Sequence, residues 1–172
     1  QLNPDWIELP SGLLHGISAT TIAVWIRDLS PARDGGRLFD FATSSRDEFY
    51  FSPVDENPST TTQGCHLAGT ADGSVFVDLW TTTPITNGLA GKWQHVAVSW
   101  NAGSVDLYVD GVSVGTKSTP GVLPSHYGEA TTNWLGRTLN DAYYALYAEF
   151  DDFRIYNRAL TAAEITRLYQ LR

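Results

Sequence analysis

The sequence predicts a single all-β domain, a two-layered sandwich closed by one short C-terminal helix. Short runs rich in Val, Ile, Phe, Tyr, Trp and Thr recur between turn signals, which is typical of β-strands. In several runs one set of alternate side chains is apolar, as in strands with one buried face. The chain has 172 residues and shows neither an interdomain linker nor an internal repeat, so residues 1–172 fit one domain.

Three runs carry the clearest alternation. They are TTIAVWIRD at residues 20–28, SVFVDLWT at residues 74–81 and HVAVSW at residues 95–100. Each is predicted to be a strand with one face in the core. The expected core faces are Ile22, Val24 and Ile26 in the first run, Val75, Val77 and Leu79 in the second, and Val96, Val98 and Trp100 in the third.

Residues 93–116 are predicted to form a three-stranded meander. The turn NAGS at residues 101–104 separates the first two strands, and Asp110-Gly111 separates the second and third. Asp-Gly between alternating runs favours a type I′ hairpin turn, because both central residues need positive φ. Pro, Ser, Thr and Gly are frequent in residues 30–36, 55–73 and 118–130, which are therefore interpreted as loops.

One helix is predicted after residue 160. Thr161 fits an N-cap, and Glu164 three residues later completes a capping box. Leu160 and Ile165 stand where a hydrophobic staple would form. Ile165, Leu168 and Tyr169 then give a one-sided apolar stripe, which is expected to pack on the sandwich.

Composition limits the classes of partner. The formal net charge is −8, with only 11 Lys plus Arg and no basic run, which argues against nucleic acid and anionic membrane surfaces. A neutral ligand or a cation such as calcium fits better. No apolar stretch approaches the roughly 20 residues of a membrane span. Cys65 is the single cysteine, so no internal disulfide can form. Without methionine or a signal peptide, the chain is expected to be a piece of a longer or processed protein.

Seven segments, in order, carry a resemblance to a known family. They are WIELPSGLL, TIAVWIR, RLFDFA, WQHVAVSW, LYVDGVSVGT, NWLGR and FDDFRIYNRALTAAEI, and they cover nearly the whole chain. The sequence resembles the laminin-G-like domain of the concanavalin A-like lectin/glucanase superfamily, in the subtype appended to secreted bacterial glycoside hydrolases. The resemblance implies an antiparallel jelly-roll β-sandwich with a short C-terminal helix, and an extracellular or cell-surface location. Ala148 stands where the family tends to have Gly, and the strand usually found before WIELP is absent.

The resemblance also allows a test for catalysis. Retaining glucanases of this fold carry the pattern E-x-D-x-x-E on one strand, because two carboxyl groups about 5 Å apart are needed. Here Glu149 and Asp151 match, but Arg154 occupies the last position. No serine or cysteine protease-like order and no zinc-binding pattern is apparent. We therefore expect a domain that is not itself an enzyme, with a hydrolase or lyase as a less favoured alternative.

Calcium is implied at the C-terminal strand. In calcium-binding relatives an aspartate in D-x-x-R-x-Y helps to hold a structural calcium ion, and Asp151 matches it, with Asn3 and Asp5 as the expected partners. Alternatively, Asp151 caps a turn or pairs with an arginine. Asp152 is predicted to face the opposite way, where an ion pair with Arg154 would be purely structural.

A sugar-binding face is predicted on the strand at residues 74–81, since the superfamily binds sugars on one sheet face. Phe76, Asp78 and Trp80 share the face opposite the core, where an indole would stack on a sugar ring and a carboxylate would bind its hydroxyls. The alternative is that Trp80 packs inside the sandwich. Further candidate sugar contacts are Tyr50, Tyr127, Arg137, Asn140 and Tyr143. Trp25, Trp93, Trp100 and Trp134 are assigned to packing.

These observations predict a carbohydrate-binding or accessory domain, tethered to the catalytic domain of a secreted polysaccharide-degrading enzyme and stabilised by calcium. Its ligand would be a polysaccharide or oligosaccharide. A structural or adhesive protein-interaction domain of laminin-G type is the alternative, because one fold serves many functions. An aromatic and polar face exposed on one sheet would favour the first prediction.

Overall fold

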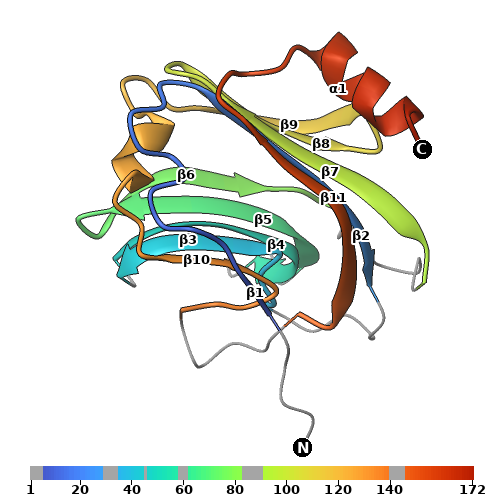
Figure 1. Cartoon of the computed structure of the whole chain (residues 1–172), viewed down its shortest axis with the longest axis horizontal. Helices are drawn as coiled ribbons and strands as arrows, with labels where there is room; N and C mark the ends of the chain where they lie inside the picture. The colour runs from blue at the N-terminus through green and yellow to red at the C-terminus, as the bar shows by residue number, and fades with distance from the viewer. Residues whose placement is uncertain (1–5, 29–34, 45, 58–61, 83–90, 140–145) are drawn as a thin grey trace, which may run out of the picture.

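The computed structural model describes residues 6–28, 35–44, 46–57, 62–82, 91–139 and 146–172. It is an antiparallel jelly-roll β-sandwich of two stacked sheets (Figure 1). The six-stranded sheet runs, from edge to edge, through β1 (Ile7–Glu8), β10 (Thr132–Leu135), β3 (Phe39–Ser44), β4 (Asp47–Asn57), β5 (Thr62–Ala71) and β6 (Ser74–Trp80). The five-stranded sheet runs through β11 (Ala148–Tyr156), β2 (Thr20–Asp28), β7 (Trp93–Trp100), β8 (Ser104–Val109) and β9 (Val112–Ser118).

The core lies between the two sheets. It consists of one cluster of buried side chains contributed by alternate positions of the strands. Large members with less than 2 % exposure are Phe39, Phe41, Phe49, Phe51 and Trp100. Cys65 is also buried in this cluster. The packing prediction for Trp100 is therefore confirmed.

The strand predictions at residues 20–28 and 93–116 are confirmed. The first run is β2, and the second is the meander β7–β8–β9. Asp110 and Gly111 both have positive φ, 49° and 78°, as a type I′ turn requires.

The prediction of a loop across residues 55–73 is wrong. Strand β5 runs from Thr62 to Ala71 and pairs with both β4 and β6. Its small residues are imposed by close neighbours. A Cβ atom on Gly64 would lie 2.0 Å from the carbonyl oxygen of Thr81, and one on Gly69 would lie 2.8 Å from the Tyr127 hydroxyl. The glycines of this segment are therefore explained by the close approach of neighbouring atoms to the strand, and they do not mark a turn.

Helix α1 (Ala162–Gln170) begins as predicted. The Thr161 hydroxyl accepts from the Glu164 backbone N–H, and the Glu164 carboxylate accepts from the Thr161 N–H at 2.9 Å. Ile165 is fully buried with Leu160 against Ala23 and Ala97 of the five-stranded sheet. Figure 1 shows α1 lying over this sheet on the side away from the core. No helix in the described part of the chain is long and apolar enough to cross a membrane.

We call the sheet faces that point away from the shared core the outer faces. The outer face of the five-stranded sheet carries Ala23, Ala97 and Tyr108, which contact the helix region. The outer face of the six-stranded sheet carries polar, charged and aromatic side chains instead. This second face contains most of the described candidates for ligand binding.

Candidate functional site

One row of side chains crosses five strands of the six-stranded sheet. Register pairs Trp134 of β10 with Asp40 of β3, Asp40 with Tyr50 of β4, Tyr50 with Ala68 of β5, and Ala68 with Asp78 of β6. Their strand neighbours, such as Phe39, Phe41, Phe49 and Leu79, lie in the core. Because side chains alternate along a strand, this row lies on the outer face.

At the β6 edge, Trp80 is held by a network that we call the Trp80 cluster: Trp80, Asp78, His66, Asp55 and Tyr50. The His66 and Trp80 rings stack with centroids 3.7 Å apart and planes 12° apart. The indole Nε1–H donates to Asp78 Oδ1 at 2.7 Å, and His66 Nε2 lies 3.1 Å from the same oxygen. His66 Nδ1 lies 3.2 Å from Asp55 Oδ2 and 3.4 Å from the Tyr50 hydroxyl.

The geometry distinguishes the accessible members of this cluster from its support. The side chain of Asp78 is 51 % exposed and Trp80 is partly exposed, whereas His66 is buried. Asp78 Oδ2 has no hydrogen-bond partner among the described residues. Trp80 and Asp78 are thus the members that a ligand can reach.

Tyr50 has the predicted orientation, opposite the buried Phe49 and Phe51, but it is only 8 % exposed. The guanidinium carbon of Arg37 lies 3.1 Å from the centre of its ring, and Arg37 Nη1 lies 3.9 Å from Asp55 Oδ2. Burial raises the pKa of the Tyr50 hydroxyl to about 12. In this arrangement the buried Tyr50 contacts His66 and helps to hold it in place, and it does not face a ligand.

Two carboxyl groups with unusual titration lie on β3 and β4. Burial raises the pKa of Asp40, although its Oδ2 accepts from the backbone N–H of Leu139 at 3.1 Å. Burial and then the nearby Asp40 carboxylate raise the pKa of Glu48 to about 7. The Oε2 atom of Glu48 is buried and has no hydrogen-bond partner among the described residues. Perturbed acids of this kind are frequent at functional sites.

The prediction that Phe76 shares a face with Asp78 and Trp80 is wrong. The β5–β6 register shifts between Gly69 and Thr70, which face Val77 and Val75, so Phe76 is the extra residue of a β-bulge. Phe76 packs against the core cluster, with its ring 5.6 Å from that of His126. Val75, expected in the core, is 64 % exposed for the same reason.

Tyr127, predicted as a sugar contact at the rim, is a core residue. It is 2 % exposed, lies in the short 3₁₀ helix Pro124–Tyr127, and stacks on Phe49 with ring centroids 5.6 Å apart. Burial raises the pKa of its hydroxyl. The candidates Asn140 and Tyr143 lie outside the described residues.

Arg137 lies at the opposite edge of the six-stranded sheet from Trp80. Its guanidinium carbon is 4.2 Å from the ring centre of Trp6 and 4.4 Å from that of Trp134. Trp6 is 44 % exposed and Trp134 is partly exposed. The sequence reasoning missed Trp6, and it missed His66 because β5 had been interpreted as a loop.

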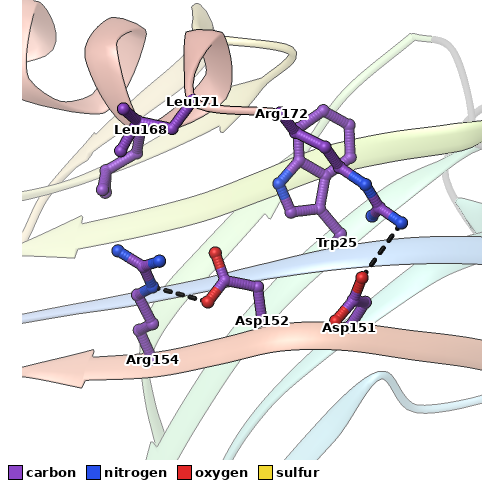
Figure 2. Close-up of a pocket in the computed structure, with 7 residues that line it drawn as sticks. All are labelled: Trp25, Asp151, Asp152, Arg154, Leu168, Leu171 and Arg172. Atoms are coloured by element: carbon purple, nitrogen blue, oxygen red, sulfur yellow. Dashed lines mark hydrogen bonds and ion pairs between the residues drawn. The ribbon is translucent and has the colours of Figure 1, made fainter.

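The acidic pair that motivated the catalytic and metal hypotheses lies on β11. Opposite β2 the register shifts between Asp151 and Arg154, and Asp152 has a left-handed φ of 53°. This bulge directs both aspartates to one side, toward the C-terminal residues (Figure 2), so the prediction of opposite orientations is wrong. The predicted ion pair is confirmed, because Arg154 Nε donates to Asp152 Oδ1 at 2.7 Å.

The described residues fit a calcium ion poorly. Asp151 Oδ2 already pairs with Arg172 Nη2 at 2.9 Å, and the neighbouring Asp152 pairs with Arg154. Within the described residues, no group of three or more His, Cys, Asp or Glu side chains is arranged to hold a metal ion. Asn3 and Asp5, the expected partners, lie outside those residues. Calcium at this edge therefore stays a prediction.

A family model described as the concanavalin A-like lectin/glucanases superfamily matches residues 3–166. The chain belongs to this superfamily. Its laminin-G type agrees with the resemblance in the sequence and with the two-sheet architecture. No curated protein matches the chain in sequence.

Solved members of this fold include binding domains. Domain 4 of a GH43 extracellular arabinanase from Geobacillus stearothermophilus, solved with arabinotriose, has a TM-score of 0.69 at 20 % identity and covers 98 % of this chain and 75 % of its own. A pentraxin from Limulus polyphemus has a TM-score of 0.65 at 21 % identity, covering 94 % and 72 %. Botulinum neurotoxin type C, whose cell entry depends on two ganglioside molecules, has a TM-score of 0.67 at 17 % identity, covering 99 % and 44 %.

Proposed function

We propose that this chain is a non-catalytic carbohydrate-binding domain whose ligand stacks on Trp80 at the outer face of the six-stranded sheet. The observation that carries the proposal is the fixed, partly exposed indole of Trp80, stacked on His66 and hydrogen-bonded to Asp78. An aromatic ring offers a stacking surface for the C–H face of a sugar ring, and a carboxylate beside it accepts hydrogen bonds from the hydroxyls.

The network prepares the indole before a ligand arrives. His66 covers one face of the Trp80 ring, so a sugar ring can stack only on the other face. Asp78 fixes the indole through Oδ1 and keeps Oδ2 for a ligand hydroxyl. Because these side chains are already ordered, binding loses little of their conformational entropy.

The charge of the site restricts the class of sugar. Asp78, with a side chain 51 % exposed, is the carboxylate of the Trp80 cluster that a ligand meets. It would repel an acidic polysaccharide but not a neutral oligosaccharide. We therefore propose a neutral glycan, with the arabinotriose bound by the arabinanase domain as the first compound to test.

The biological role proposed is that of an accessory domain of a secreted polysaccharide-degrading enzyme. The arabinanase relative is one domain of such an enzyme. A tethered domain of this kind raises the local concentration of its catalytic partner on the substrate, without any chemistry of its own. The departure at Arg154 from the glucanase pattern agrees with this non-catalytic role.

The test is a glycan array, followed by calorimetric titration of arabinotriose and of each array hit. Trp80→Ala is expected to weaken binding at least tenfold, which is about 1.4 kcal/mol. Trp93→Ala, which removes a partly exposed indole from the other sheet, is the matched control and should bind like the wild type. Unchanged affinity in Trp80→Ala overturns the platform. Retention of no array glycan overturns the function and favours a protein-interaction domain.

Calcium has its own test. If Asp151 and the N-terminal residues Asn3 and Asp5 hold a structural calcium ion, EDTA should lower the thermal unfolding midpoint and calcium should restore it. The measurement is thermal unfolding of protein purified in calcium, with magnesium as the control cation. A midpoint that is the same with and without EDTA contradicts the calcium prediction.

A further inference from the structure

A pocket of about 300 Å³ lies between the β11 bulge and the C-terminal end of α1 (Figure 2). Its floor includes the indole of Trp25, and its apolar wall is formed by Leu168 and Leu171. Asp151, Asp152, Arg154 and Arg172 supply its charges. None of these side chains takes part in the Trp80 cluster, and the proposed carbohydrate binding does not use them.

Arg172 lines this pocket and also lies against a group of side chains at its edge. Its guanidinium carbon lies 4.3 Å from the ring centre of Trp93 and 5.1 Å from that of Trp25. Its Nη2 lies 2.9 Å from Asp151 Oδ2. Two aromatic faces and one carboxylate are the groups that favour a guanidinium over other side chains, because they combine cation–π contact with a charge-assisted hydrogen bond.

The walls of this guanidinium box, defined as Trp25, Trp93 and Asp151, are held by contacts that do not involve Arg172. Trp25 stacks on Tyr169 with ring centroids 5.7 Å apart. Trp93 also contacts Arg27, whose guanidinium carbon is 5.3 Å from its ring centre. Asp151 lies on β11 directly opposite Trp25 in register. The box should therefore keep its shape when Arg172 leaves.

The position of Arg172 allows it to leave. It lies two residues beyond Gln170, the last residue of α1, so its movement does not require the helix to unwind. Its side chain is 38 % exposed, and the neighbouring Leu171 is 74 % exposed. The second acid of the bulge, Asp152, is neutralised by Arg154, so the charge available to an incoming cation is that of Asp151.

We propose that the guanidinium box, at the edge of this pocket, is a docking site for an arginine side chain of a partner protein, and that Arg172 occupies the box as an intramolecular competitor. Charge complementarity supports this partner, because the chain carries a net charge of −8 and would attract a basic segment. Leu168 and Leu171 would contact an apolar residue next to the incoming arginine. The site is separate from the sugar platform and does not depend on it.

The test compares wild type, Arg172→Ala and Arg172→Gln with an acetylated and amidated tripeptide that has arginine between glycine and leucine. Binding is followed through the indole N–H signals of Trp25 and Trp93 in NMR spectra. A tethered competitor at an effective concentration of about 1 mM, with a dissociation constant of about 0.1 mM for the box, weakens peptide binding about tenfold, so removing Arg172 should tighten it by about that factor. Arg167→Ala, which removes a cation from the same helix outside the pocket, should bind like the wild type.

Two further comparisons make the test decisive. The same peptide with citrulline, which keeps the shape but lacks the charge, should bind at least tenfold more weakly to Arg172→Ala. Adding Asp151→Asn to that variant should remove most of the affinity for the arginine peptide. Equal binding of both peptides, insensitivity to Asp151→Asn, or no gain in either Arg172 variant while its Trp25 and Trp93 signals show a folded protein would overturn the proposal.

Discussion

The outer faces of the two sheets differ in what covers them. On the five-stranded sheet, the small side chains of Ala23 and Ala97 leave room for α1, and Ile165 is fully buried against them. On the six-stranded sheet, Asp40 and Glu48 are buried or half-buried with raised pKa values. The part of the first face that α1 covers is an extension of the core, whereas the second face holds two carboxyl groups whose pKa values are raised by burial.

A short amphipathic helix covers an apolar sheet face by ordinary packing, and its charges are paired at the surface, as in the contact of Arg158 with Glu164 at 2.7 Å. Local conflicts with stability are expected at functional sites, which favours the six-stranded sheet as the sugar-binding face.

The largest effect is expected from Ile165→Ala. It removes a fully buried side chain between α1 and the five-stranded sheet, and it should lower the free energy of unfolding by about 2–5 kcal/mol. Urea unfolding measures this, with Leu171→Ala as the matched control. Leu171 is 74 % exposed and should change stability by no more than about 0.5 kcal/mol. Equal losses of stability in the two variants would contradict the difference between the two faces, since α1 would then not be packed on the five-stranded sheet through Ile165.

A smaller effect is expected from Glu48→Gln, and it should depend on pH. The folded-state pKa of Glu48 is about 7 against an ordinary 4.5, so between these values the folded state binds more protons than the unfolded state. Stability therefore falls as pH rises from about 4.5 to 7, and Glu48→Gln should remove part of this fall. Urea unfolding at pH 5 and pH 8 tests it. Glu129→Gln, at a side chain 81 % exposed, is the control; identical pH profiles in the two variants would contradict the assignment.

The smallest effect is expected from Thr161→Ala. The variant removes the hydroxyl that accepts from the Glu164 N–H at the start of α1, and it should cost about 1 kcal/mol. Thr161→Ser, which keeps the hydroxyl, should retain most of the stability. Thermal unfolding midpoints of both variants measure how much of the stability that α1 adds to the five-stranded sheet depends on the first turn of the helix. A serine variant as unstable as the alanine variant would argue against the capping role.

Much of the fold could be predicted because its signals are local. The alternation in residues 20–28 requires only that side chains of a strand point to opposite faces. The turn at Asp110-Gly111 depends on the backbone preferences of two residues. The start of α1 depends on a capping box within four consecutive residues. Strand β5 was not predicted because its glycines are required by close contacts with Thr81 and Tyr127, which are distant in sequence.

The candidate site was predicted less completely. Asp78 and Trp80 lie where alternation placed them, but Phe76 and Asp152 are displaced by β-bulges. A bulge depends on the register between two strands, so it cannot be predicted from the sequence of either strand alone. Tyr127 was predicted at the rim because prolines and glycines surround it in sequence, which indicated a surface loop. In the structure its ring packs against Phe49 and Trp100.

The all-β class, the meander, the capped helix and the membership of the superfamily can be predicted from the amino-acid sequence, because they depend on neighbouring residues and on ordered motifs. Which side chains meet depends on the three-dimensional packing. His66 stacks on Trp80, Arg37 covers Tyr50, and Arg172 fills the guanidinium box because strand register and helix placement bring them together from distant parts of the chain.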